Sequence, residues 1–335
     1  MKIVSLFSGA GGLDLGLIEA GHEIVWANDN DEDSVATYRK NIGYHIVLDD
    51  IENIASSYIP ECDVVVGGFP CQGFSLANLR RAPSDERNHL YRQFLRVIRD
   101  KQPRYFLAEN VRGILSLGQG KVIERIVSDF ASVGYRVNYQ SFNMADFGVP
   151  QTRVRVIIAG TREDLPLFSD YEFPCASHSR NPKRDGLFPW ITIHEALRNV
   201  PDPDRHPKKV PNQLYSKYKV TNRNFTGHRT TDPRKPSPTI LARGNGKGGV
   251  CAIQHPANKR RLSIRESASI QTFPLDFVFE GKMNSAYRQV GNAVPVLFAV
   301  RLGEQLRKLE LSAKSPRSAY RARSVSERLA VGAAI

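Results

Sequence analysis

The sequence is poor in cysteine and has no long apolar run. Its four cysteines, Cys62, Cys71, Cys175 and Cys251, include no C-x-x-C pair. This spacing argues against a disulfide framework or a zinc knuckle, and it fits a reducing cytoplasm. No stretch approaches the roughly 18 uninterrupted apolar residues of a membrane-spanning helix. The first residues, MKIVSLFSGAGGLDLG, are too rich in glycine for a signal peptide and reach Asp14 too early.

The composition is that of a folded protein with room for a large core. Hydrophobic residues make up 41% of the chain and charged residues 24%, which is close to ordinary globular usage and excludes extensive disorder. At roughly 100–200 residues per domain, a chain of 335 residues predicts two domains, or one domain with a large insertion.

The charge is divided unevenly along the chain. In total, 47 Lys and Arg residues outnumber 34 Asp and Glu residues, which gives a formal net charge of +13. Residues 1–70 hold three basic and twelve acidic residues, whereas residues 201–265 hold fifteen basic and three acidic residues. The basic segment is a candidate binder of a nucleic-acid backbone, and a solvated basic surface is an equally weighted alternative.

The first 160 residues alternate between strand and helix patterns. Short apolar runs predict strands, and apolar positions at helical spacing predict helices between them. Strands are expected at 2–7, 22–27, 63–66, 105–108, 135–142 and 154–159, and helices at 12–20, 31–40, 86–99 and 122–132. This alternation predicts an α/β fold with an open, mostly parallel sheet, in which ligands bind beyond the carboxyl ends of the strands.

Regular patterns fade after about residue 161, where only a short helix at 192–197 is expected. Helical periodicity returns at 263–272 and 292–309, which indicates that the chain comes back to the first domain. The predicted organisation is a first domain of residues 1–163 and 261–310, an inserted irregular domain of residues 164–260, and a basic tail of residues 311–335.

A glycine-rich turn, FSGAGGLDLG, joins the first predicted strand to the first helix. It has the form of a nucleotide-cofactor turn, but Asp14 stands where the dinucleotide fingerprint needs its third glycine. An acidic residue there suits a cationic or amine-bearing cofactor, and a purely structural turn is the alternative. Asp29 and Asp50 follow the next two strand patterns. Each alone is more often a helix cap, whereas together with the turn they favour an adenosine-containing ligand.

Three further motifs end at the same predicted edge of the sheet. Cys71 lies in the turn GGFPCQGFS, where a cysteine is placed as a nucleophile more readily than as a core residue. Glu109, in ENV, is an acid–base partner or a helix cap. Arg153 and Arg155 fall on one face of the next strand, positioned to anchor a phosphate or to hold a carboxylate.

The order of these motifs resembles that of the DNA cytosine-5 methyltransferases of the bacterial type II restriction-modification kind. FSGAGGLDLG, GGFPCQGFS, ENVRG, QTRVRVIIAG, RESASIQTFP and QVGNAVPV occur in the family's order, over residues 3–160 and 261–305. The Pro-Cys turn alone is weak, but the ordered set of six is highly specific. The resemblance implies a Rossmann-like, S-adenosylmethionine-dependent methyltransferase sheet with a smaller, irregular target-recognition domain.

The resemblance also implies the chemistry. Cys71 would attack C6 of a cytosine, after which C5 takes the methyl group of S-adenosylmethionine and loses its proton. Glu109 would hold the base at N3 and the exocyclic amine, and Arg155, supported by Arg153, would stabilise the covalent intermediate. A cytosine inside a duplex cannot reach a buried cysteine, so the base must be flipped out.

The cofactor site implied by the resemblance lies at the glycine turn and the following strand ends. Phe7 would pack on the adenine, Asp29 would bind the ribose, and Asp50 with Ile51 would border the purine. The complete implied set is Phe7, Gly9, Gly11, Gly12, Asp29, Asp50, Ile51, Pro70 and Asn292.

Double-stranded DNA is the implied partner, bound at a short specific sequence. Residues 75–87 are polar and are favoured as a loop that closes over DNA, with an ordinary surface loop as the alternative. In the basic region, an arginine could read guanine, although phosphate contact is the commoner role. The implied DNA-binding residues are Ser75, Arg80, Arg81, Arg87, Arg229 and Arg243.

Three other functions stay open. The first is an RNA cytosine-5 methyltransferase acting on tRNA. The second is a non-catalytic nucleic-acid-binding homologue, which the presence of Cys71, Glu109, Arg153 and Arg155 disfavours. The third is an NAD-dependent oxidoreductase, which Asp14 and the Pro-Cys turn disfavour. We further expect a cytoplasmic bacterial monomer without a metal or a membrane partner. It would protect DNA from a cognate restriction endonuclease without forming a stable complex with it.

Overall fold

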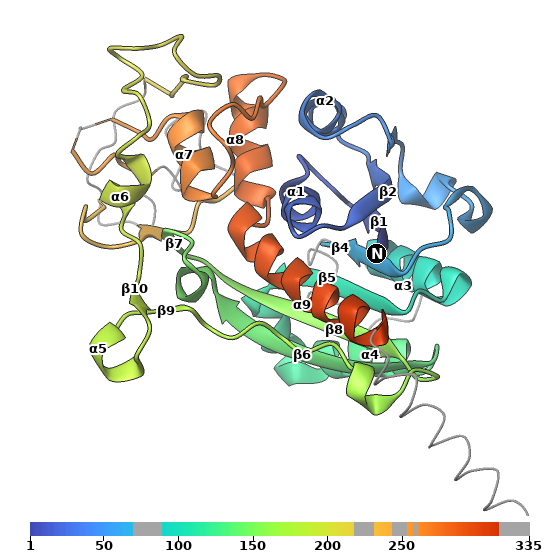
Figure 1. Ribbon diagram of the computed structural model, residues 1–335. Helices are drawn as coiled ribbons and strands as arrows, with labels where there is room; N and C mark the ends of the chain where they lie inside the picture. Colours follow the sequence, from blue (N-terminus) through green and yellow to red (C-terminus); the bar gives the residue numbers. More distant parts are fainter. Residues whose placement is uncertain (70–88, 218–230, 243–252, 258–259, 315–335) are drawn as a thin grey trace, which may run out of the picture.

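The computed structural model describes residues 1–69, 89–217, 231–242, 253–257 and 260–314. Within these residues, seven strands form one central sheet in the order β3-β2-β1-β4-β5-β8-β6 (Figure 1). The strands are β1 (Lys2–Leu6), β2 (Glu23–Asp29), β3 (Ile46–Leu48), β4 (Val64–Gly67), β5 (Tyr105–Val111), β6 (Tyr135–Asn143) and β8 (Val154–Arg162). The neighbours among β1 to β5 pair in parallel, whereas β8 is antiparallel to both β5 and β6. The predicted α/β fold with a mostly parallel sheet is confirmed.

Four very short strands, nine α-helices and several 3₁₀ turns complete the described part of the chain. The short strands pair as β7 (Gln151–Thr152) with β11 (Ser237–Pro238), and β9 (His178–Ser179) with β10 (Phe188–Pro189). The helices are α1 (Gly12–Glu19), α2 (Glu32–Asn41), α3 (His89–Lys101), α4 (Lys121–Ala131), α5 (Pro182–Asp185), α6 (Ile193–Leu197), α7 (Ile264–Ile270), α8 (Met283–Asn292) and α9 (Val296–Lys314). In the described part of the chain, no helix is both long and apolar enough to cross a membrane.

The alternation of side chains along the strands divides the core into two layers. Ile3 faces one layer, which includes buried residues of α1, α2 and α9. Val4 faces the other layer, which includes buried residues of α3 and α4. Successive side chains of a strand point to opposite faces, so one apolar strand supplies both layers. Figure 1 shows α9 lying across the sheet, far in sequence from the strands that it covers.

Of the two helical segments predicted after residue 260, the one at 263–272 is found as α7, whereas the bounds of the second were wrong. The pattern at 292–309 predicted one helix, whereas α8 ends at Asn292 and α9 begins at Val296. Pro295 lies in this break, where it lacks a backbone N–H and disfavours a helical conformation at the preceding residue. The sequence pattern did not reveal the rest of α8. The last helix runs on to Lys314, four residues into the expected tail, and residues 315–335 lie outside the described part.

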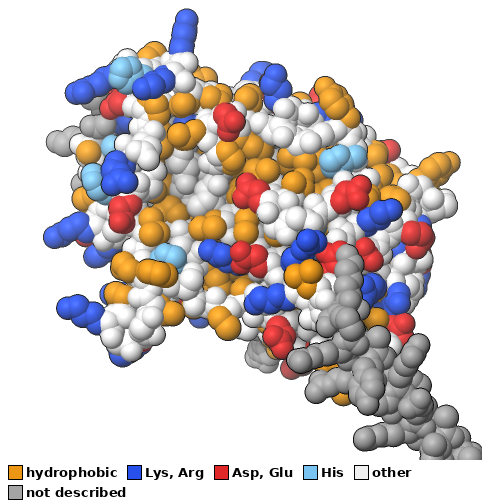
Figure 2. Space-filling model, in the orientation of Figure 1, with side chains coloured by type: hydrophobic (Ala, Val, Ile, Leu, Met, Phe, Trp, Pro, Cys, Tyr) orange, Lys and Arg blue, Asp and Glu red, His pale blue; other side chains and the backbone are white. Residues whose placement is uncertain are grey.

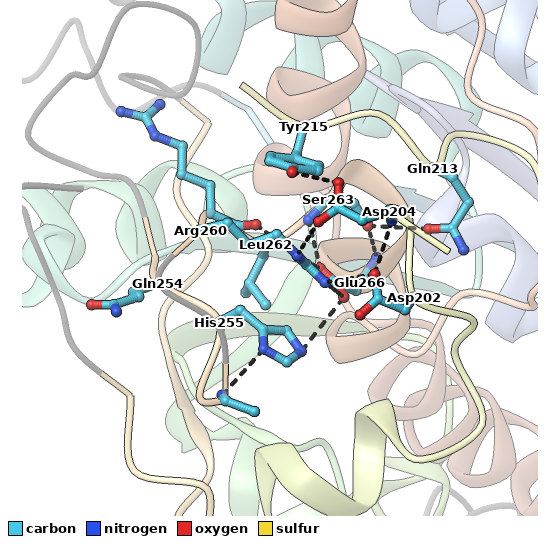
Figure 3. A network of polar contacts seen from close by, with 12 residues as sticks. Asp202, Asp204, Gln213, Tyr215, Gln254, His255, Arg260, Leu262, Ser263 and Glu266 are labelled. Carbon is cyan, nitrogen blue, oxygen red and sulfur yellow. Dashed lines mark hydrogen bonds and ion pairs between the residues drawn. The ribbon is translucent and has the colours of Figure 1, made fainter. Parts of the chain in front are cut away.

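The inserted segment of residues 164–260, called the irregular region below, is attached to α7 by a network of charged side chains (Figure 3). Arg260 forms two contacts with Glu266, Nη1 to Oε2 at 2.7 Å and Nη2 to Oε1 at 2.8 Å. Glu266 also accepts a hydrogen bond from the backbone N–H of Ser263 and so closes a capping box at the start of α7. Asp202 and Asp204 approach the same guanidinium from the irregular region. This network ties the irregular region to the returning segment.

Candidate active site

A cavity of about 820 Å³ lies at the carboxyl ends of the parallel strands. Its walls come from the turns after β1, β2, β3, β4 and β5, from the start of β8, and from the end of α8. This is the usual ligand position in an open α/β sheet. The predicted site residues that line it are Phe7, Gly9, Gly12, Asp29, Asp50, Ile51, Glu109, Arg153, Arg155 and Asn292. The structure therefore brings most of the predicted set together around one space.

The remaining predicted residues fall into two groups. Gly11 is part of the turn but does not line the cavity, because it faces α2, where an added Cβ would lie 2.3 Å from Ile42 Cδ1. The others lie outside the described residues: Pro70, Cys71, Ser75, Arg80, Arg81, Arg87, Arg229 and Arg243.

The glycine-rich turn has an uncommon backbone conformation. Phe7 and Gly9 both have a φ of 55°, in the left-handed region that glycine adopts readily and phenylalanine rarely. Holding a non-glycine residue such as Phe7 in this conformation costs on the order of 1 kcal/mol, and backbone strain of this kind clusters at ligand sites. Gly12 is needed for a different reason, since an added Cβ would lie 2.5 Å from the carbonyl oxygen of Val294. The turn is thus shaped by the returning segment as well as by its own residues.

The carboxylates of Asp29 and Asp50 are held by backbone N–H groups. Asp29 accepts from the N–H of Gly9 at 2.8 Å and from the N–H of Asp31 at 2.9 Å. Burial raises the pKa of Asp29, and the two backbone hydrogen bonds oppose that rise. Asp50 accepts from the N–H of Glu52 at 3.2 Å and caps a short 3₁₀ turn, η1 (Ile51–Asn53). Both carboxylates are fixed where hydroxyl or amine donors of a ligand can reach them.

Asp14, which breaks the dinucleotide pattern, is fully buried beside the cavity. Its two carboxylate oxygens accept hydrogen bonds from the Ser5 hydroxyl at 2.7 Å and from the Tyr38 hydroxyl at 2.8 Å. Burial raises the pKa of Asp14 to about 6, against the lowering effect of these two hydrogen bonds. Asp14 therefore braces α1 against β1 and α2, and adds negative charge to this end of the cavity.

Glu109 on β5 and Arg155 on β8 form an ion pair, and the strand order places it on the other side of β1 from Asp29 and Asp50, at the other end of the cavity. Glu109 Oε1 lies 2.8 Å from Arg155 Nε, and each side chain is 13% exposed. The pairing follows from the sheet register, because Arg155 lies opposite Val111 and is a diagonal neighbour of Glu109 across the antiparallel pair. The carboxylate is thus held beside a cation and still faces the cavity.

Arg153 is almost completely buried, in the break between β7 and β8. Its Nη1 donates to the carbonyl oxygen of Ile240 at 3.0 Å, which ties the wall segment Leu241–Ala242 to the site. Burial and, to a smaller extent, the charge of Arg155 lower the pKa of Arg153 to about 9, against an opposing effect of Glu109. Arg153 therefore supports the wall and adds to the positive charge near Glu109.

Several site residues carried no predicted role. Asn110 is buried and donates from Nδ2 to the carbonyl oxygen of Phe69 at 3.0 Å, which joins the ends of β5 and β4. Gln151 accepts from the N–H of Ile240 at 2.7 Å and donates to Gln271 at 2.6 Å. Asn110, Gln151 and Gln271 all lie within the sequence motifs, and this was the feature of the sequence that could have indicated a role for them. Their buried amide contacts join segments far apart in the sequence, and no local pattern predicts such contacts.

Charge differs between this cavity and the irregular region. Five aspartates of the first 50 residues line the cavity and make up what we call its acidic end: Asp14, Asp29, Asp31, Asp49 and Asp50. Figure 2 shows Lys and Arg side chains projecting along the edge of the molecule formed by the irregular region, around α6. Exposed residues of that region include Lys208, Lys209, Arg234 and Lys235. In the described part of the chain, no group of three or more His, Cys, Asp or Glu side chains could hold a metal ion.

Comparison with known proteins gives a consistent result. The family described as C-5 cytosine-specific DNA methylase matches residues 1–308. The type II methyltransferase M.NgoFVII of Neisseria gonorrhoeae is 38% identical over 337 residues, covering 91% of this chain and 86% of the relative. The type II methyltransferase M.MthTI of Methanothermobacter thermautotrophicus is also 38% identical, over 338 residues, covering 92% and 97%.

The fold is similar to that of solved methyltransferases. The crystal structure of S. pombe Dnmt2 methyltransferase matches with a TM-score of 0.68 at 18% identity, covering 92% of this chain and 99% of that one. At this identity the likeness concerns the fold alone. The family match over nearly the whole chain shows that the protein belongs to the C-5 cytosine-specific DNA methylases and is a DNA (cytosine-5-)-methyltransferase.

Proposed function

We propose that the protein methylates C5 of a flipped-out cytosine within a short, specific sequence of double-stranded DNA, through a covalent bond between Cys71 and C6. The observation that carries this proposal is that one cavity has two unlike ends. One end presents carboxylates held by backbone N–H groups, and the other presents the Glu109–Arg155 pair. In the sequence, Cys71 follows Phe69, which lines the same cavity, by two residues.

The acidic end of the cavity suits S-adenosylmethionine, because its carboxylates can accept hydrogen bonds from the hydroxyl and amine groups of this cofactor. This cofactor supplies a methyl group on a positively charged sulfonium, which leaves as a neutral thioether. Asp29 would accept hydrogen bonds from ribose hydroxyls, and Asp50 from the exocyclic amine of the purine, since both carboxylates line the cavity. Phe7 offers an aromatic face beside them, and the surrounding carboxylates favour a cationic ligand.

The opposite end suits the base. Glu109 would accept from the exocyclic amine of cytosine and hold a proton at N3, which makes C6 more electrophilic. The Cys71 thiolate would add to C6, and C5 would then attack the methyl carbon of the sulfonium, so that the sulfur leaves as a neutral thioether. Loss of the C5 proton and of the Cys71–C6 bond would restore the aromatic ring. Arg155, which already lies beside Glu109, would stabilise the negative charge that develops on the base.

We also propose the division of labour along the chain. Residues 1–163 and 261–310 would form the catalytic domain, since buried residues of α9 share a core with those of the sheet. Residues 164–260 would recognise the target sequence, and their exposed basic side chains would contact phosphates. We propose that the protein acts as a monomer in the bacterial cytoplasm. Because its relatives are named type II methyltransferases, we propose that the methylated product is protected from a cognate endonuclease.

Transfer of labelled methyl groups from S-adenosylmethionine to duplex DNA and to tRNA tests this function. We expect label in duplex DNA alone, and bisulfite sequencing of a plasmid treated with the protein should place 5-methylcytosine in one short sequence context. Label confined to tRNA would overturn the choice of substrate. Methylation at another base or atom would overturn the proposed chemistry.

A further inference from the structure

The purine-bordering wall of the cavity is held from outside by a residue that does not line it. This wall consists of Asp50 and Ile51, at the start of the η1 turn. Arg96 of α3 donates from Nη2 to the carbonyl oxygens of Ile51 at 2.9 Å and of Ile54 at 3.0 Å. The guanidinium thus bridges the first residue of the turn and the residue that follows the turn.

The other two nitrogens of Arg96 also donate hydrogen bonds. Nη1 donates to the Ser56 hydroxyl at 2.8 Å, and Nε donates to Gln93 at 2.6 Å. Ser56 in turn donates to Asp100 at 2.6 Å, so the segment around residue 56 is bound to α3 at two positions. A planar guanidinium with its donors fixed in a fork sets both the distance and the angle between the groups it joins.

The helix that carries Arg96 also contacts the cavity directly. Leu90, in its first turn, lines the cavity, and Arg96 lies almost two helical turns farther along. The short strand β3 lies at the edge of the sheet, and the η1 turn follows it. An edge position leaves the backbone with fewer neighbours that constrain it. The hydrogen bonds of Arg96 to Ile51, Ile54 and Ser56, which we call the clamp, therefore restrain this turn as neighbouring strands would in the middle of the sheet.

We propose that Arg96 is a positioning residue for the purine end of the cofactor site. It acts through the backbone of Ile51 and Ile54, and sets where Asp50 and Ile51 meet the base. This assignment rests on the proposed S-adenosylmethionine cofactor. Charged donors to carbonyl groups are among the stronger hydrogen bonds of proteins, so their loss should move the turn and weaken purine binding.

The test compares Arg96→Met, which keeps the aliphatic stem, with Arg99→Met on the same helix. Arg99 is the matched control, because its side chain is 60% exposed and it contacts Asp100 at Oδ1, whereas Ser56 donates to Oδ2. Calorimetry on the full chain measures the Kd of S-adenosylhomocysteine and of adenosine, which probes the purine end without the amino-acid part. Arg96→Lys provides a second variant that keeps the charge but not the fork.

We expect Arg96→Met to weaken both ligands by the same factor, about tenfold, which corresponds to about 1.4 kcal/mol. The KM for S-adenosylmethionine should rise by a similar factor while kcat at saturating cofactor stays within about twofold, as uniform binding requires. Arg99→Met should leave both Kd values within about twofold, and Arg96→Lys should fall between the two.

Three results would overturn the assignment. Unchanged Kd values in a folded Arg96→Met, or in Arg96→Lys where the first variant fails to fold, would show that the clamp is only structural. A loss for S-adenosylhomocysteine but not for adenosine would place the effect at the wrong end of the cofactor. If the parent protein bound neither ligand, the proposed cofactor itself would be wrong, and this inference would fail with it.

Discussion

The two ends of the cavity are built in different ways. At the acidic end, the carboxylates of Asp29 and Asp50 accept hydrogen bonds from backbone N–H groups of neighbouring residues. At the other end, Glu109 and Arg155 hold each other across an antiparallel strand pair, and Arg153 anchors a wall segment nearly ninety residues away. The carboxylates of the first end are thus held by backbone groups within the first 52 residues, whereas the second end depends on side-chain contacts between segments farther apart in the sequence. Substitutions at the two ends should therefore separate cofactor binding from chemistry.

The largest separation is expected from Glu109→Gln. The amide keeps the size of the side chain but cannot hold a proton on the base, and loss of such acid–base assistance costs about 100-fold or more in rate. Cofactor affinity should stay within about twofold because Glu109, on β5, is separated from Asp29 and Asp50 by β1 and β4. Single-turnover methylation and calorimetry with S-adenosylhomocysteine measure the two quantities. A comparable loss in both would show that the ends are not independent.

Asp14→Asn should change the pH dependence of stability. Because burial raises the pKa of Asp14 from 3.8 to about 6, the native state binds this proton more tightly than the unfolded state. The associated stability is complete below pH 3.8 and is lost as pH rises through about 6. The free energy of unfolding of Asp14→Asn, relative to the parent, should therefore increase by about 2 kcal/mol between pH 4.5 and 7.5.

Urea unfolding of both proteins across this pH range provides the measurement. The substitution also alters the hydrogen bonds with Ser5 and Tyr38, which contributes an offset at every pH. Only the slope therefore carries the prediction. A pH-independent difference between the two proteins would show that Asp14 is not held with a raised pKa.

Asp29→Asn should weaken the cofactor about tenfold, because the amide cannot accept from both Gly9 and Asp31 as the carboxylate does. The rate at saturating cofactor should stay within about threefold. Calorimetry measures the cofactor Kd and single-turnover methylation at saturating cofactor measures the rate, so the two effects can be separated. Full affinity combined with slow chemistry would reverse the roles assigned to the two ends.

The smallest effect is expected from Arg288→Met. Arg288 Nη2 lies 2.6 Å from Asp31 Oδ2 at the cavity wall, but the two side chains are 48% and 33% exposed. Exposed ion pairs contribute about 0–1 kcal/mol, so the cofactor Kd should change by less than about fivefold. A loss above tenfold in calorimetry would indicate that Arg288 contacts the cofactor itself, and that local carboxylates alone do not define the acidic end.

The same contrast explains what the sequence could predict. The turn after β1, Asp29 and Asp50 were predicted because strand ends and glycine turns leave a local pattern. The antiparallel placement of β8 leaves no such pattern, and neither does the wall at Leu241–Ala242, which depends on contacts from Arg153 and Gln151. These features are tertiary, so only the assembled fold shows them.

The helix α8 was missed for a related reason. Its buried face includes Ser285, Gln289 and Gly291, so its apolar periodicity is interrupted by buried polar and small residues. Gln289 is buried because it accepts a hydrogen bond from Thr37 at 2.6 Å and donates to the carbonyl oxygen of Glu280 at 2.9 Å. A polar residue satisfied in the core looks like a surface residue in the sequence.

The most direct test of the central claim is a covalent trap on duplex DNA that carries 5-fluorocytosine at the target base. After methyl transfer, C5 holds fluorine in place of the proton that must leave, so the Cys71–C6 bond cannot be released. With S-adenosylmethionine present, the parent protein should form an adduct that survives denaturing electrophoresis, and Cys71→Ala should form none. An adduct that persists in Cys71→Ala, or methylation of cytosine by a parent protein that forms no adduct, would contradict the account.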